Sequence, residues 1–324
     1  MSSPAISEQA VSPTSRKSTS PARMYGLLVL ATLCWGGTPV AGKEALQGFG
    51  PMALAQLRVL LAAIVYMTVF LIWRNRPRLK LTRRDWLFFV VVALMGSCLN
   101  QVFFIVGLSK SSVVHSGLIA STGPVMVLLI SCLARLEALT FQKIAGMSLS
   151  FSGVVLLTIG QASQQWGSHW LGDVLLLGGS ATFAAYTVLV KELADRYDAL
   201  TLNTLAFALG AIILIPFGAQ SVWEANWVGL STSAWLGLLY MVVFGSVIPY
   251  LLYAFALTEL MASRVAAFSY LQPLVTAALG AWWLAEKLTL QVMLYGVMIL
   301  LGVYVTEWGR DNGEAAEKPE KTAP

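Results

Sequence analysis

Long apolar stretches alternate with short polar segments along most of the chain. Each stretch has close to the ~20 residues that a helix rising ~1.5 Å per residue needs to cross a hydrocarbon core of ~30 Å. Backbone amides in that core find no water to bond, so each stretch is predicted to be a helix. We therefore predict ten membrane-spanning helices, at residues 24–44, 52–73, 86–107, 113–133, 143–160, 171–191, 201–219, 234–257, 264–285 and 291–308.

The composition agrees with lipid as the solvent of this chain. Hydrophobic residues make up 57% of the 324 residues and charged residues only 11%, and the mean hydropathy is +0.72. Soluble domains carry ~25% charged residues, so this chain has too few to cover a water-facing surface. Cys34, Cys98 and Cys132 all fall within apolar stretches, which predicts buried thiols and no disulfide framework. The predicted fold class is an all-α integral membrane protein.

The second half of the chain repeats the first at a fixed distance. Pro124 and Pro273 lie 149 residues apart (273 − 124), and Glu137 and Glu286 share this offset. The offset relates residues 82–160 to 231–309 without a gap, with the further identical pairs Trp86 and Trp235, Gly96 and Gly245, Ser97 and Ser246, Leu108 and Leu257, Thr140 and Thr289, Gln142 and Gln291, Gly153 and Gly302, and Gly160 and Gly309. Repeated units of membrane helices are typical of transporters that hold their substrate path at the repeat interface.

The repeat divides the chain into two units of five predicted helices, residues 24–160 and 171–309. Because five crossings is an odd number, the second unit enters the membrane from the opposite side. The units are therefore predicted to be inverted repeats, related by a pseudo-two-fold axis in the membrane plane. Residues 1–23, rich in Ser, Pro and Ala, are predicted to form a disordered tail, and residues 310–324 a second tail.

The basic residues are distributed unevenly between the two sides of the predicted membrane. Of the 21 Lys and Arg residues, Lys43, Lys110 and Lys287 fall on one side and Arg58 falls within a helix, which leaves 17 (21 − 4) on the side shared by both termini. Positive loops stay in the cytoplasm, so both termini are predicted to be cytoplasmic. The basic residues lie in loops where they orient helices, so no nucleic-acid partner is predicted.

Short motifs in both halves carry a family resemblance. The first half contains Trp35-Gly36-Gly37, Pro51 followed by Arg58, Gly96-Ser97-Cys98-Leu99-Asn100-Gln101, and Pro124 followed by Glu137. The second half contains Gln272-Pro273, Glu286-Lys287-Leu288-Thr289 and Gly302. Over residues 24–309 the chain resembles EamA-type members of the drug/metabolite transporter superfamily. It departs from their usual pattern at Leu136, where a Gly commonly precedes the Glu, and at Pro249, which stands where the repeat would place a mate for Asn100.

The resemblance implies a multi-pass permease of the inner (plasma) membrane, often an exporter of amino acids or other small metabolites. With the inverted repeats, it predicts a secondary transporter that works outward by alternating access. The expected partners are a small-molecule substrate and the lipid bilayer; a homodimer is compatible with the sequence, which carries no signal for one. The alternatives are an intramembrane enzyme and a non-transporting membrane receptor or scaffold.

The candidate substrate-binding residues are the polar and aromatic side chains that fall within predicted helices. Prolines near them free backbone carbonyls one turn back, and broken helices of this kind bind substrates in other transporters. Aromatic side chains offer apolar walls with hydroxyls for orientation. The alternative is ordinary helix packing with interhelical hydrogen bonds. The set is Trp35, Thr38, Arg58, Asn100, Gln101, Ser121, Tyr186, Tyr250, Tyr253, Tyr270 and Gln272.

Charged residues near the predicted helices leave several interpretations open. Arg58 is either a cavity cation that holds a carboxylate or another anionic group, or a snorkelling side chain, or one paired with helix-end carbonyls or Glu44. His115 is either a proton-responsive gate or an interface histidine. Glu137 and Glu286 are expected to cap the helices that follow them, with a coupling role as the alternative.

Several functional classes lack their residues in this sequence. No Asp or Glu falls at the middle of a predicted helix, which disfavours coupling through a buried carboxylate and leaves downhill transport, exchange, or proton coupling through His115 or a carboxylate at a helix end. No Walker motif, metal-spaced His/Cys cluster or dinucleotide glycine pattern occurs. ATP-driven pumping, a bound metal and a cofactor are therefore not predicted.

Overall fold

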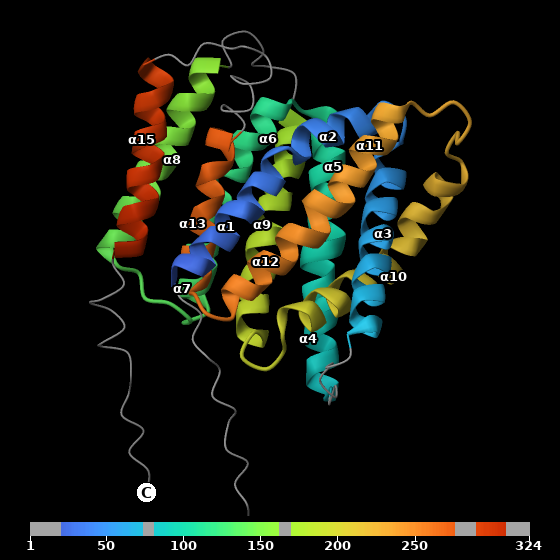
Figure 1. The fold of residues 1–324 in the computed structure, drawn as a ribbon, viewed down its shortest axis with the longest axis horizontal. Coiled ribbons are helices and arrows are strands. Elements are labelled where there is room, and N and C mark those ends of the chain that lie inside the picture. The colour runs from blue at the N-terminus through green and yellow to red at the C-terminus, as the bar shows by residue number, and fades with distance from the viewer. Residues whose placement is uncertain (1–20, 74–80, 162–169, 276–289, 309–324) are drawn as a thin grey trace, which may run out of the picture.

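A computed structural model describes residues 21–73, 81–161, 170–275 and 290–308, and in these ranges every regular element is a helix (Figure 1). The elements are α1 Pro21–Gly36, α2 Thr38–Leu46, α3 Pro51–Ile72, α4 Arg83–Ala93, the π-helix η1 Leu94–Leu99, α5 Asn100–Lys110, α6 Val113–Ala120, α7 Gly123–Leu133, α8 Phe141–Gln161, α9 Trp170–Leu193, α10 Ala199–Trp223, α11 Thr232–Val242, the π-helix η2 Val243–Val247, α12 Ile248–Leu257, α13 Ala262–Ala267, the 3₁₀-helix η3 Phe268–Leu271, and α15 Leu290–Trp308.

Seven helical stretches in the described ranges are long and apolar enough to cross a membrane. They are Ala22–Leu46, Pro51–Ile72, Arg83–Lys110, His115–Leu133, Trp170–Leu193, Ala199–Trp223 and Thr232–Leu257. Phe141–Leu156 and Met293–Thr306 are shorter apolar helices. Large apolar side chains such as Ile72, Leu133 and Phe217 are exposed by 67% to 84%, as expected for a surface that faces lipid. Residues 276–285 of the predicted ninth helix, and most of both predicted tails, lie outside the described residues.

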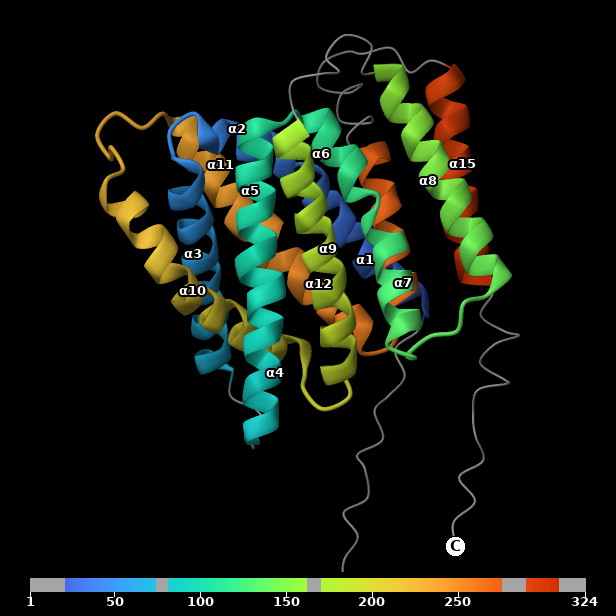
Figure 2. The same ribbon diagram turned by 180° about the vertical axis from the view of Figure 1, so that it is seen from behind.

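The two ends of the described chain lie at the same edge of the bundle. The Pro21 end of α1 and the Trp308 end of α15 both lie at the lower edge in Figure 1, which we call the terminal edge. At the opposite edge, which we call the far edge, α2 ends and α6 and α9 begin; Figure 2 shows the same arrangement from behind.

Helix boundaries recur between the two halves at nearly the same offset as the sequence repeat. In two pairs, α4 and α11, and α6 and α13, the second helix begins 149 residues after the first (for example 232 − 83). Helix α10 begins 148 residues after α3 (199 − 51). The two π-helices also recur: η1 begins at Leu94 and η2 at Val243, and each contains a Gly-Ser pair. The duplication therefore extends to an uncommon local backbone geometry, and π-helical turns often occur at functional sites.

Small residues let α8 and α15 pack closely. A Cβ added at Gly302 would lie 2.5 Å from the backbone nitrogen of Ser150 and 2.6 Å from the carbonyl oxygen of Gly146. The Ser150 hydroxyl donates to the carbonyl of Ile299 at 3.1 Å. Such close backbone approach is a common means of helix association in lipid, where burial of apolar surface provides little driving force.

Replacing Gly302 by valine is expected to separate α8 from α15, since the new side chain meets backbone atoms that cannot rotate away. Overpacking of this kind costs ~1–3 kcal/mol. The matched control is Gly296→Val on the same helix, where an added Cβ approaches only the flexible Leu274 side chain, at 3.3 Å. Thermal aggregation of the purified protein in detergent should begin at a lower temperature for Gly302→Val than for Gly296→Val. Equal onset temperatures for the two variants would show that the stability of the protein does not depend on close packing at Gly302.

Candidate functional site

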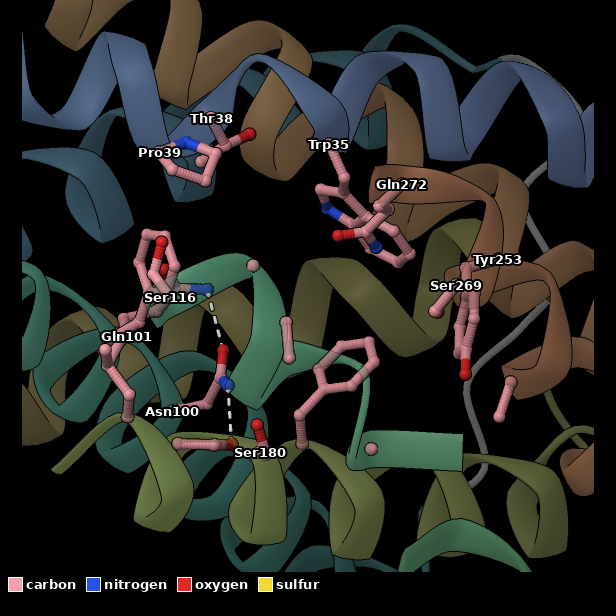
Figure 3. Close-up of a pocket in the computed structure, with 18 of the residues that line it drawn as sticks. Trp35, Thr38, Pro39, Asn100, Gln101, Ser116, Ser180, Tyr253, Ser269 and Gln272 are labelled. Carbon is pink, nitrogen blue, oxygen red and sulfur yellow. Dashed lines mark hydrogen bonds between the residues drawn. The ribbon is translucent and has the colours of Figure 1, made fainter. Parts of the chain in front are cut away.

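A cavity of about 130 Å³ lies in the middle of the bundle, between helices of the first and second halves (Figure 3). We call it the central cavity. Its lining residues are Trp35, Thr38, Pro39, Arg58, Asn100, Gln101, Phe104, Ser116, Gly117, Ala120, Gly123, Pro124, Val127, Leu176, Gly179, Ser180, Phe183, Tyr250, Tyr253, Ala266, Ser269 and Gln272.

Three of the helical stretches that line the central cavity are interrupted beside it. A turn at Gly37 separates α1 from α2, and a turn at Ser121 and Thr122 separates α6 from α7. The 3₁₀-helix η3 follows α13 directly and carries Ser269. The turns remain hydrogen bonded, since the Ala41 nitrogen donates to the Gly37 carbonyl and the Thr122 nitrogen donates to the Ile119 carbonyl, both at 3.0 Å. The interruptions therefore place helix ends next to the cavity.

Arg58 supplies a buried positive charge to the wall of the cavity. Arg58 is 3% exposed. Its Nε donates to the Ser246 hydroxyl at 2.9 Å and one Nη donates to the Gly245 carbonyl at 2.9 Å. Across the described ranges no carboxylate lies within 4.0 Å of the guanidinium. The cation is therefore held by neutral acceptors, and its charge remains available to an anionic group in the cavity.

The π-helix η2 organises side chains of the first half around this charge. The Gly245 carbonyl that accepts from Arg58 also accepts from the indole nitrogen of Trp35 at 3.1 Å. The Tyr66 hydroxyl donates to the carbonyl of Val247 at 2.7 Å. A π-turn changes the regular pairing of backbone carbonyls along the helix. Here three side chains from α1 and α3 bond to this turn of the second half.

A hydrogen-bonded chain crosses the cavity between residues that the repeat makes equivalent. The Gln101 amide donates to the Tyr250 hydroxyl at 2.8 Å, and these residues are 149 apart (250 − 101). The Tyr250 hydroxyl donates to the Asn100 side-chain oxygen at 3.0 Å, and the Asn100 amide donates to the Gly179 carbonyl at 2.9 Å. Figure 3 shows Asn100 and Gln101 side by side at the wall.

Aromatic rings form the apolar part of the lining. The Trp35 ring lies edge-on to Phe183, Tyr250 and Tyr253, with centroid separations of 5.5, 5.8 and 5.3 Å. Two buried acceptors near this wall, the Thr38 hydroxyl and the Gln101 side-chain oxygen, have no hydrogen-bond partner among the described residues. Unpaired buried polar atoms are costly, so a ligand that supplies donors would relieve them. The cavity thus offers one cation, unpaired acceptors and an apolar wall of aromatic rings.

Comparisons with known proteins agree with this architecture. The profile of the EamA-like transporter family matches the chain twice, over residues 22–159 and 170–308. The chain belongs to the EamA-like transporter family.

Relatives of this EamA-family chain match it over most of their length. An uncharacterized transporter from Archaeoglobus fulgidus is 35% identical over 281 residues, which covers 86% of this chain and 96% of the relative. The WAT1-related protein At1g44800 from Arabidopsis thaliana is 25% identical over 306 residues, covering 85% of this chain and 82% of the relative. A crystal structure with 17% identity superposes with a TM-score of 0.72, covering 92% of this chain and 100% of the other, and shows the fold alone.

Eight of the eleven residues singled out from the sequence line the central cavity of this EamA-family chain: Trp35, Thr38, Arg58, Asn100, Gln101, Tyr250, Tyr253 and Gln272. The other three lie behind or beside the lining. The Ser121 hydroxyl donates to the Leu118 carbonyl of its own helix, and the Tyr186 hydroxyl donates to the side-chain oxygen of Asn203 at 3.1 Å. Tyr270 is buried in a second apolar cluster with residues of α7, α8 and α15.

Sequence reasoning passed over several lining residues. Phe104 lies one turn after Asn100 on the same helix face, and its ring lies 5.8 Å from the Arg58 guanidinium carbon. Phe183 lies one turn before Tyr186 and stacks on it at 5.7 Å. Helical spacing from a residue already chosen could have found both. Ser180 contacts the Ile119 carbonyl at 3.2 Å, and nothing in its apolar surroundings distinguishes it in the sequence.

Two expectations about charged residues need correction. Arg58 neither snorkels nor pairs with Glu44; of the expected structural partners it has a helix carbonyl, that of Gly245 in η2 of the other half, together with the Ser246 hydroxyl. Glu137 does not cap the helix that follows it. Its carboxylate accepts from the Ser263 backbone nitrogen at 2.9 Å, at the start of α13, and pairs with Lys143 at 2.7 Å. Glu137 therefore connects two segments that are distant in the sequence. Glu286 lies outside the described residues.

Removing the Ser246 hydroxyl is expected to destabilise the protein more than removing its repeat mate, Ser97. Ser246→Ala leaves the buried Arg58 Nε without its acceptor, and hydrogen bonds to charged groups contribute ~1.5–3 kcal/mol. Ser97→Ala removes a donor to the neutral Ala206 carbonyl, a bond that contributes ~0.5–1.5 kcal/mol. Apparent melting temperatures of the two purified variants test the difference. A larger loss for Ser97→Ala would show that Arg58 does not depend on Ser246.

Proposed function

We propose that this chain is a secondary transporter whose central cavity binds small organic metabolites that carry a carboxylate, such as amino acids. The observation that supports this most is the Arg58 guanidinium, buried at the cavity wall with only neutral partners among the described residues. A substrate carboxylate would compensate its charge. The ring wall of Trp35, Phe183, Tyr250 and Tyr253 suits an apolar side chain.

We further propose that the chain forms ten membrane helices as two inverted repeats. The recurring helix starts support the repeat. Two contacts support a symmetry axis through the bundle: Gln101 with Tyr250, and Ser150 with Ile299. Both pairs are 149 residues apart (250 − 101 and 299 − 150), and a residue can touch its own repeat mate only near the axis that relates the halves. A cavity beside such an axis suits alternating access.

The proposed setting is the inner membrane, with the terminal edge in the cytoplasm and transport directed outward. The excess of basic loops at that edge supports the orientation, because positive loops stay cytoplasmic. The outward direction rests on the resemblance to exporters. The cavity lining includes no Asp or Glu. Any coupling to protons therefore uses groups elsewhere in the chain.

Flux measurements in proteoliposomes test the proposed function. Purified protein is reconstituted, and a panel of radiolabelled amino acids and other small carboxylates is offered. We expect time-dependent, saturable movement of at least one compound, recovered chemically unchanged from the lumen. Recovery of a converted product would favour the enzyme alternative, and absence of flux across the panel would contradict transport.

Arg58→Gln should lower the flux of a carboxylate substrate about tenfold or more, since a charge-assisted hydrogen bond contributes ~1.5–3 kcal/mol and 1.4 kcal/mol is a factor of ten. Flux of the neutral amide analogue should change much less. The control is Arg196→Gln, which removes a cation that is 53% exposed and pairs with Asp85. Equal losses for carboxylate and amide would assign Arg58 to structure rather than to substrate binding.

A further inference from the structure

A second polar cluster lies at the far edge of the bundle, beyond the lining of the central cavity. The His115 Nδ1 lies 2.9 Å from a carboxylate oxygen of Asp173. The other oxygen of Asp173 accepts from the Ser111 hydroxyl, and the Lys43 ammonium donates to the Ser111 carbonyl at 2.6 Å. We call these four residues the far-edge cluster. The His115 and Asp173 side chains are 12% and 29% exposed.

The far-edge cluster joins two helices that also line the central cavity. His115 lies in the first turn of α6 and is followed directly by the lining residues Ser116 and Gly117. Asp173 lies in the first turn of α9, one turn before the lining residue Leu176. The separation of His115 and Asp173 therefore reports how closely α6 and α9 approach each other at this end of the cavity.

Protonation of His115 is linked to that approach. Histidine is the side chain whose charge ordinarily changes between about pH 5 and 8. A cation in the first turn of α6 is opposed by the helix dipole, whereas the Asp173 carboxylate is favoured in the first turn of α9. An imidazolium at His115 would form an ion pair with Asp173 only where α6 and α9 are together. By reciprocity, a bound proton stabilises the arrangement in which α6 and α9 are together.

Other charged groups at this edge come from the helices around α6. Helix α2 contributes Lys43 and Glu44, and Lys110 ends α5. Helix α8 also packs on α6, but its charged residue, Lys143, lies at the terminal edge beside Glu137. Asp173 is the described carboxylate that contacts His115 directly.

We propose that His115 and Asp173 form a proton-binding site, and that a proton taken from the water at the far edge closes this end of the central cavity by holding α6 against α9. The His115 imidazole accepts the proton and becomes an imidazolium paired with the Asp173 carboxylate. Loss of the proton to the same water removes the ion pair and lets the two helices separate.

The sequence repeat shows that this cluster is not required by the helical scaffold. At the terminal edge the mate of His115 is Arg264 (115 + 149), and the mate of Ser111 is Leu260 (111 + 149). The residue of α1 that corresponds to Asp173 of α9 is Met24 at an offset of 149 residues (173 − 149), or Tyr25 at an offset of 148 (173 − 148). The same helices therefore form at the other edge with a permanent cation in place of a titratable one. The His115–Asp173 pair therefore has no counterpart at the matching positions of the terminal edge.

Reactivity of a cysteine in the cavity tests the proposal without any substrate. Gly117→Cys is introduced after Cys34, Cys98 and Cys132 are replaced by serine; a Cβ at Gly117 meets no heavy atom within 4 Å. An impermeant maleimide is added to right-side-out and inverted vesicles. Asn226→Cys, in the exposed segment between α10 and α11, identifies the preparation that presents the far edge.

Labelling rates are compared with those of the same protein carrying His115→Gln. The ratio of the two rates cancels the intrinsic pH dependence of the thiol, which is the same in both proteins. We expect labelling about fivefold or more slower than in His115→Gln near pH 5.5, and equal near pH 8.5, since fivefold is the lower end of typical coupling between sites. A rate ratio that stays constant over this pH range would overturn the proposal.

Three further variants separate a proton site from a general change in structure. His115→Arg copies the Arg264 of the second half and should keep labelling slow at every pH. Asp173→Asn should label like His115→Gln. His169→Gln removes the other histidine of the chain and should keep the pH dependence. Fast labelling of His115→Arg, or loss of pH dependence in His169→Gln, would contradict the assignment. These rates require no transport, so they stand apart from the proposed function.

Discussion

The burial of one guanidinium constrains the centre of this molecule. A charged side chain at mid-membrane costs ~2.5–3.5 kcal/mol on insertion scales unless it finds partners. Arg58 finds them in the Ser246 hydroxyl and the Gly245 carbonyl, both in the π-helix of the other half. The same carbonyl also holds Trp35. The contact that makes the charge tolerable therefore also fixes the two halves around the cavity and orients its cation and its largest ring.

The scaffold is duplicated, but the chemistry of the two halves differs. Helix α10 begins 148 residues after α3, so Ala206 is the residue of the second half that corresponds to Arg58 in the repeat (58 + 148). The Ser97 hydroxyl donates to the Ala206 carbonyl at 2.8 Å, and the Ser246 hydroxyl accepts from the Arg58 Nε at 2.9 Å. The serine contact is thus present twice, once with a backbone carbonyl and once with a cation. Likewise, the repeat pairs an amide, Gln101, with a phenol, Tyr250. Equivalent positions thus carry different chemistry at one cavity.

Hydrophobic periodicity and spacing predicted much of this arrangement, and its limits have physical causes. Apolar stretches marked the helices because lipid demands paired backbone and apolar surface. The break at Ser121 lies beside Pro124, where a proline-broken helix was expected, whereas the break at Gly37 and both π-helices leave hydropathy unchanged and so escaped prediction. Buried polar side chains were good markers of the cavity because each is costly in lipid. Their partners were not predictable where these are backbone carbonyls, such as Gly245, or residues far away in sequence, such as Ser263 for Glu137.

The central claim is that the cavity between the halves is the route of transport, and occupying it chemically tests that claim most directly. In protein without its native cysteines, Ser180→Cys places a thiol in the cavity lining, and Ala181→Cys places one on the exposed neighbouring position. Flux is measured in proteoliposomes before and after complete reaction with a bulky maleimide. The account predicts that modification at position 180 abolishes flux, that substrate slows this modification, and that modification at position 181 has little effect. Undiminished flux through protein fully modified at position 180 would contradict it.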